Sequence, residues 1–144
     1  MKPAPVLRAA SVLSSLLAAG HTLGSRKSWS PLGETEVLAA MRTQPMDVGG
    51  VQRTYFDFYL GFGFTLSVYL LLQAVLLWQL ANVARVEPLR ARPMVAAIFG
   101  ASLAATLVAW QFLFIVPVVF SGTITAVLAV ALFALRQAPS TGGR

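Results

Sequence analysis

Long apolar runs separated by short polar stretches organise this chain of 144 residues. The clearest run extends from about Tyr55 to Val83 with Asp57 as its single charge, and it exceeds the ~20 residues that a helix needs to cross a bilayer. Every position between Arg92 and Arg136 is uncharged, which gives enough length for two more spans. The pattern therefore predicts three membrane-spanning helices after residue 54.

The second of these runs must be interrupted, because one helix of about forty residues would extend far beyond the bilayer. Pro117 lacks a backbone donor and restricts the residue before it, so we expect the break there. The two predicted spans cover about residues 93–116 and 117–136. A very short turn around Phe114 to Ser121 is expected to join them.

The N-terminal apolar segment has two interpretations. Residues Ala9 to Gly20 are uncharged, follow a basic start and end in small residues. This is also the pattern of a secretory signal peptide. A helix over about residues 5–24 would just span the bilayer if the side chain of Arg8 snorkels. A retained helix is favoured because small residues at four-residue spacing build close helix contacts in lipid, and this segment has them at Ser11, Ser15 and Ala19.

Residues 25–54 form the one sizeable polar segment, which we expect to be an outer loop. Ser30 followed by Pro31 and nearby acidic residues is typical of a helix start. The short helix is expected to end near Met41, and its apolar residues share one face, so it would lie on the membrane surface or cap the helices. A pair of glycines then turns the chain back.

The expected fold class is all-α. We predict a polytopic membrane protein with a single transmembrane domain over residues 1–144, in which four helices form an antiparallel bundle and the outer loop contains the short amphipathic helix. Small residues allow close approach of helices in lipid, and every predicted span contains them. The third span has them at successive four-residue steps, at Ala97, Ala101, Ala105 and Ala109.

Composition and charge agree with a membrane location. Hydrophobic residues make up 57% of the chain and charged residues 11%, against about a quarter in soluble domains. The net charge is +6, but the basic residues form no cluster or stripe that could follow a row of phosphates, so nucleic acid is not expected as a partner. Seven of the 11 basic residues fall on one side of the predicted spans and four in the outer loop, which predicts that both termini are cytoplasmic.

Polar residues near the outer ends of the spans are the candidates for ligand binding: His21, Asp57, Tyr59, Trp110 and Gln111. An imidazole and a carboxylate at one depth could exchange a proton or bind a polar headgroup. Each residue also has a structural interpretation, since Asp57 could cap its helix, His21 could bond the outer loop, and the aromatic residues fit an interfacial belt. With one His and no Cys, no metal or cofactor is expected.

Gln73 lies near the middle of its predicted span. It could hold a ligand carbonyl, but a single glutamine at this depth more commonly bonds a neighbouring helix, and we expect that here.

Four short motifs carry a family resemblance: Gly20-His21, Pro45-Met46, Tyr59-Leu60-Gly61-Phe62-Gly63 and Phe114-Ile115-Val116-Pro117. With them, the chain from about Arg8 to Leu135 resembles small, uncharacterised bacterial integral membrane proteins with four helices. The resemblance implies a four-helix architecture in a bacterial inner membrane. It implies no reaction.

Two kinds of function therefore stay open. The first is a non-catalytic accessory or lipid-interacting bundle, whose partners are membrane lipids, a second copy of the chain or another membrane protein. The alternative is a binder or enzyme for an apolar lipid-like ligand, such as a quinone, a sterol-like lipid or an isoprenoid lipid. In that case an outer-leaflet pocket would use His21 and Asp57.

Overall fold

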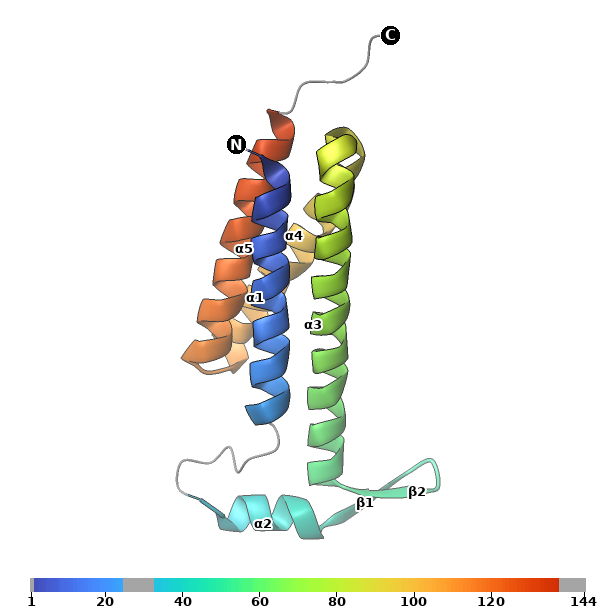
Figure 1. Ribbon diagram of the computed structural model, residues 1–144. Helices are drawn as coiled ribbons and strands as arrows, with labels where there is room; N and C mark the ends of the chain where they lie inside the picture. Colours follow the sequence, from blue (N-terminus) through green and yellow to red (C-terminus); the bar gives the residue numbers. More distant parts are fainter. Residues whose placement is uncertain (1, 25–32, 138–144) are drawn as a thin grey trace. The chain divides into compact units, whose positions relative to one another are not determined.

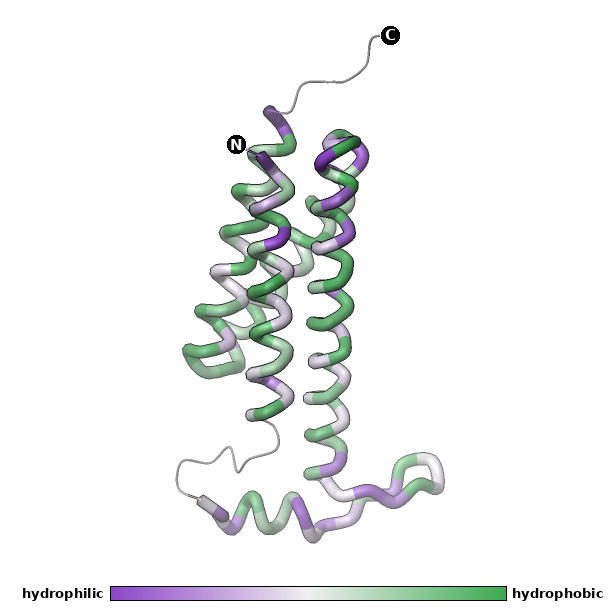
Figure 2. The backbone as a smooth tube through the Cα atoms, in the orientation of Figure 1, coloured by the Kyte–Doolittle hydropathy of each residue, from purple (hydrophilic) through white to green (hydrophobic). Residues whose placement is uncertain are grey.

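A computed structural model describes residues 2–24 and 33–137 of the chain (Figure 1). Four of its helices are long and apolar enough to cross a membrane, and Figure 2 shows apolar residues along most of their length. The predictions of a helical fold and of four long apolar helices are confirmed, and length and composition indicate a multi-pass membrane protein. The elements in chain order are α1 (Pro3–Gly24), α2 (Glu36–Thr43), β1 (Pro45–Val48), β2 (Val51–Thr54), α3 (Tyr55–Val86), α4 (Pro88–Phe112) and α5 (Ile115–Arg136).

The chain divides into two compact units. The first unit consists of residues 1–17 and 70–144, and the second of residues 18–69. Helices α1 and α3 each contribute a segment to both units, whereas α4 and α5 belong to the first and α2 and the strands to the second.

In the first unit, α4 and α5 pack closely as a hairpin whose turn consists of Leu113 and Phe114, both with extended backbone. The break therefore comes before Pro117, and the predicted turn over Phe114 to Ser121 is corrected. Pro117 is the third residue of α5, where a backbone N–H has no partner within the helix, so proline is tolerated there. Helix α4 likewise begins earlier than expected, at Pro88, which occupies the first turn as prolines often do.

The buried face of α4 differs from the face predicted from its small residues. Ala97, Ala101 and Ala105 are exposed, and of the predicted row only Ala109 is buried. Residues four apart advance about 40° around a helix at each step, so such a row winds away from any straight packing face. The expectation that this row packs inside the bundle is wrong. The buried positions of α4 are Ala91, Val95, Ser102 and Ala109.

Hydrogen bonds join α1 and α3 in the first unit. Ser11 Oγ donates to the carbonyl of Ala74 at 2.7 Å, and Gln73 Nε2 donates to Ser14 Oγ at 3.0 Å. Both serines are buried, so these bonds form away from water. The prediction that Gln73 bonds a neighbouring helix is confirmed.

In the second unit, α2 begins at Glu36 and is capped by Thr35, whose hydroxyl accepts the N–H of Leu38 at 3.3 Å. Gly33 has a φ of 76°, a left-handed conformation that ends any helix arriving from upstream. The helix start predicted at Ser30 is therefore corrected to Glu36. Ser30 itself and the proline after it lie outside the described residues.

Strands β1 and β2 form an antiparallel hairpin that closes with Val48 opposite Val51. Gly49 and Gly50 have φ values of 64° and 80°, which a tight two-residue turn between twisted strands requires. Asp47 Oδ1 accepts the N–H of Gly50 at 3.0 Å and closes the turn. The glycine pair reverses the chain as expected, and the hairpin is an addition to the predicted helices.

One interhelical hydrogen bond in the α4–α5 hairpin gives a test of its packing. The hydroxyl oxygens of Thr106 and Thr125 lie 3.1 Å apart. We expect Thr125→Val, which keeps the side-chain shape, to lower the free energy of unfolding by about 1 kcal/mol. Unfolding by SDS in mixed micelles, followed by circular dichroism, measures the change.

Thr123→Val is the matched control. Thr123 is exposed and donates to the Val119 carbonyl of its own helix, so this variant loses an intrahelical bond of the kind that Thr125 also makes with Ser121. An equal loss of stability in both variants would contradict a contribution from the bond between the helices.

Candidate functional site

Asp57 caps the start of α3 together with Thr54. The carboxylate Oδ2 of Asp57 accepts both the backbone N–H and the hydroxyl of Thr54, each at 2.9 Å. In return, Thr54 Oγ1 accepts the N–H of Asp57 at 3.1 Å. This reciprocal pair satisfies two N–H groups that lack helical partners. The structural interpretation of Asp57 is thus confirmed.

His21 is part of a polar cluster between the end of α1 and the middle of α3, within the second unit. Its Nδ1 lies 3.0 Å from Ser67 Oγ, and Thr22 Oγ1 donates to the same oxygen at 2.9 Å. Ser67 is only 5% exposed and also donates to the carbonyl of Gly63 at 3.3 Å. The cluster therefore joins two helices through one buried hydroxyl.

The structure does not bring His21 and Asp57 together. Asp57 lies ten residues before Ser67 on α3, which corresponds to about 15 Å along the helix axis. His21 bonds at Ser67, whereas the carboxylate of Asp57 bonds Thr54 at the helix start. Direct proton exchange needs a separation of about 3 Å. The expected pair is not formed, and ligand binding by either residue stays a prediction.

The other candidate residues lie in different surroundings. The ring of Tyr59 stacks with that of Phe56 in the second unit, with centroids 6.1 Å apart. Trp110 and Gln111 are exposed near the end of α4 in the first unit, and Trp110 leaves 74% of its surface uncovered. Such exposure is typical of an aromatic side chain at a membrane boundary. A role for these three residues in ligand binding stays a prediction.

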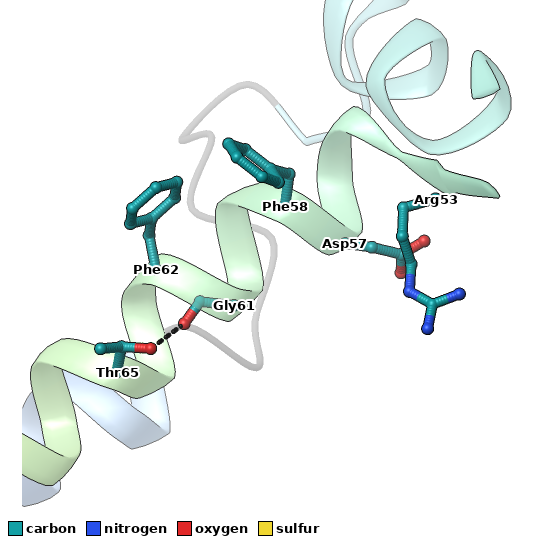
Figure 3. A pocket seen from close by; sticks show the side chains of 6 residues that line it. All are labelled: Arg53, Asp57, Phe58, Gly61, Phe62 and Thr65. Atoms are coloured by element: carbon teal, nitrogen blue, oxygen red, sulfur yellow. Dashed lines mark hydrogen bonds between the residues drawn. The ribbon is translucent and has the colours of Figure 1, made fainter. Parts of the chain in front are cut away.

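A groove runs along the first part of α3 and is called the α3 groove below (Figure 3). It has a volume of about 370 Å³. In Figure 3 the two phenyl rings lie next to each other on one side of the helix, and Arg53 lies beside Asp57 near the helix start. Its lining residues are Arg53, Asp57, Phe58, Gly61, Phe62 and Thr65.

The local sequence of α3 explains how the groove is built. Gly61 carries no side chain, and it lies one turn from both Asp57 and Thr65 on the same helix face. A Cβ atom added at Gly61 would meet nothing within 4 Å, so the space above it is open. Phe58 and Phe62 form an apolar wall, with ring centroids 4.9 Å apart in an edge-to-face arrangement.

Of the groove residues, sequence reasoning identified only Asp57 as a candidate. The signal for the others was two phenylalanines four residues apart around a glycine, with a basic residue just before the helix. The groove offers apolar contact along its length and opposite charges at one end. Among residues 2–24 and 33–137, no group of three or more potential metal ligands occurs.

Comparison with known proteins gives no relative of this chain: no family model, no curated protein and no solved structure matches it.

Asp57 allows a test that separates capping from charge chemistry. We expect Asp57→Ala to lower the free energy of unfolding, because the backbone N–H and the hydroxyl of Thr54 both lose their acceptor. Asp57→Asn keeps a side-chain oxygen at the same position and should lose less than half as much. Detergent unfolding curves measure both. If the two variants lose the same stability, the carboxylate charge and not its capping geometry is what matters.

Proposed function

We propose that the protein is a small, non-catalytic multi-pass protein of the bacterial inner membrane. It acts as a lipid-interacting or accessory helical bundle and holds a phospholipid against the α3 groove.

The observation that carries this proposal is the large apolar surface on the four long helices. Phe62 on α3 and Phe112 on α4 leave 66% and 76% of their surfaces exposed, and large exposed apolar residues also occur on α1 and α5. Soluble monomers rarely expose contiguous apolar surface on this scale, because contact between apolar surface and water is unfavourable in free energy. Lipid chains cover such a surface without that cost.

The basic residues favour an orientation with both termini in the cytoplasm. Arg85, Arg90 and Arg92 flank the connection between α3 and α4, Arg136 ends α5, and Lys2 precedes α1. Basic residues in short loops are retained on the cytoplasmic side. Four spans also return the chain to the side on which it began.

The α3 groove suits a phospholipid because it is amphipathic along its length. An acyl chain would lie against Phe58 and Phe62, above the open space at Gly61. At the helix start, the guanidinium of Arg53 would face the phosphate, and the carboxylate of Asp57 would face an ammonium group of a zwitterionic headgroup.

Filling the groove tests this proposal. We expect Gly61→Leu to lower the amount of co-purified phospholipid several-fold, because the new side chain occupies the space of the acyl chain and removes its contacts. Native mass spectrometry of the detergent-solubilised protein measures the bound lipid. Gly100→Leu on α4 is the matched control, since a Cβ there also meets nothing within 4 Å and lies outside the groove. Equal retention in both variants would contradict lipid binding in the groove.

The same measurement separates the alternative function. A quinone, sterol-like or isoprenoid lipid that is bound stoichiometrically to the wild type and lost in both His21→Ala and Asp57→Asn would favour a ligand pocket that uses these residues. Retention in both variants would exclude it.

Topology is a separate test of the proposed location. We expect a reporter fused after residue 144 to be active only as a cytoplasmic reporter, and one inserted within residues 25–54 only as a periplasmic reporter. Paired green-fluorescent and alkaline-phosphatase fusions at each position measure this. A periplasmic C-terminus would contradict the proposed orientation and would mean either that the first segment is cleaved or that the charge bias does not set the topology.

A further inference from the structure

A second cluster of polar groups lies in the first unit, where the beginning of α1 meets the end of α3. Arg8 Nη2 donates to Asn82 Oδ1 at 3.3 Å, and Arg85 Nη2 donates to the same oxygen at 3.3 Å. The guanidinium carbon of Arg8 lies 5.0 Å from the ring centroid of Trp78. Two cations thus share one neutral acceptor.

The cluster contains more N–H donors than Asn82 Oδ1 can accept. Each guanidinium carries five N–H donors and keeps its positive charge. Arg8 Nε is buried and has no hydrogen-bond partner among the described residues. A buried charged donor without an acceptor is costly, which favours an additional acceptor at this position.

Among the described residues of the first unit, no unpaired carboxylate side chain is available to neutralise the two arginines. Its segments contain seven Lys and Arg residues but a single acidic side chain, Glu87. Glu87 is already paired, with its Oε2 atom 2.7 Å from Arg90 Nε. The acidic side chains of the described part of these segments therefore supply no counterion for Arg8 and Arg85.

The position of the cluster indicates the chemistry of that counterion. Arg8 lies five residues after the first residue of α1, about 7.5 Å along the helix axis, and Asn82 and Arg85 lie in the last two turns of α3. Helix ends of candidate spans lie at the depth of lipid headgroups, where phosphate groups are concentrated.

We propose that Arg8 and Arg85 bind one phosphate group between them. The planar fork of a guanidinium matches the spacing of phosphate oxygens, and the exposed side chain of Arg85 can present such a fork beside Arg8. Two positive charges favour a phosphate with net negative charge, carried by an anionic phospholipid or by free inorganic phosphate. The site is separate from the α3 groove, so its failure would leave the proposed function standing.

Lipid binding by charge-removing variants tests the site. Delipidated full-length protein in a neutral detergent is titrated with phosphatidylglycerol, and bound lipid is measured by native mass spectrometry. We expect Arg8→Gln and Arg85→Gln each to weaken binding about tenfold, because each removes a charged pair of donors. Arg92→Gln is the matched control, since it removes the same charge from an exposed residue of the same unit and should change binding less than about twofold.

Two further arms identify the source of the phosphate and guard against misfolding. Displacement of the lipid by millimolar inorganic phosphate would assign the site to free phosphate, whereas lipid binding that resists phosphate would assign it to a lipid headgroup; either result supports a phosphate site. If Arg8→Gln does not fold, Arg85→Gln carries the same test, because Arg85 is exposed. Equal loss in Arg92→Gln and Arg85→Gln, or no binding of either probe to the wild type, would overturn the proposal.

Discussion

Every backbone N–H and C=O group within a lipid bilayer must find a partner inside the chain, and the four helices that are long and apolar enough to cross a membrane meet this requirement. Long apolar runs meet it by forming helices. Hydroxyl groups on these helices satisfy their own O–H donors by donating to the carbonyl one turn earlier, as Thr65 does to Gly61. At the start of α3, where helical partners are missing, Thr54 and Asp57 supply them to each other.

The polar groups that bond between helices have a second role. Lipid is as apolar as the helix surfaces, so the hydrophobic effect does not favour helix association there, and close packing and hydrogen bonds become more important. Ser11 donates to a carbonyl of α3, and His21 and Thr22 both bond to Ser67. In each case a small buried side chain brings the helices near enough for a direct bond. The same residues that satisfy local hydrogen bonding therefore also determine which helix faces meet.

Several features could be predicted from the sequence because they depend on local chemistry. Uncharged length predicts the three long helices after residue 54, and the spacing of small residues favours a helix for the N-terminal segment. A glycine pair predicts the chain reversal at Gly49, and an acid in the first turn predicts the cap at Asp57. Prediction was less accurate where several local signals compete, as at Pro117, which is compatible with the first turn of a helix as well as with a break. The prediction of where α2 begins was wrong for a similar reason, since Ser30 and the proline after it also match the pattern of a helix start.

Only the tertiary structure decided which faces are buried and which polar residues meet. The alanine row of α4 predicts a packing face from the sequence. Most of the row is exposed, because the packed face follows a 3.6-residue period. His21 and Asp57 both belong to the second unit, but the contact with Ser67 places the imidazole about three turns along α3 from the carboxylate. Arg8 and Arg85 are far apart in sequence and share one acceptor through packing of α1 on α3. Hydropathy and length by themselves predicted the long apolar helices after residue 54. The rotation and axial offset of the helices, which depend on packing between distant segments, determined which polar groups meet.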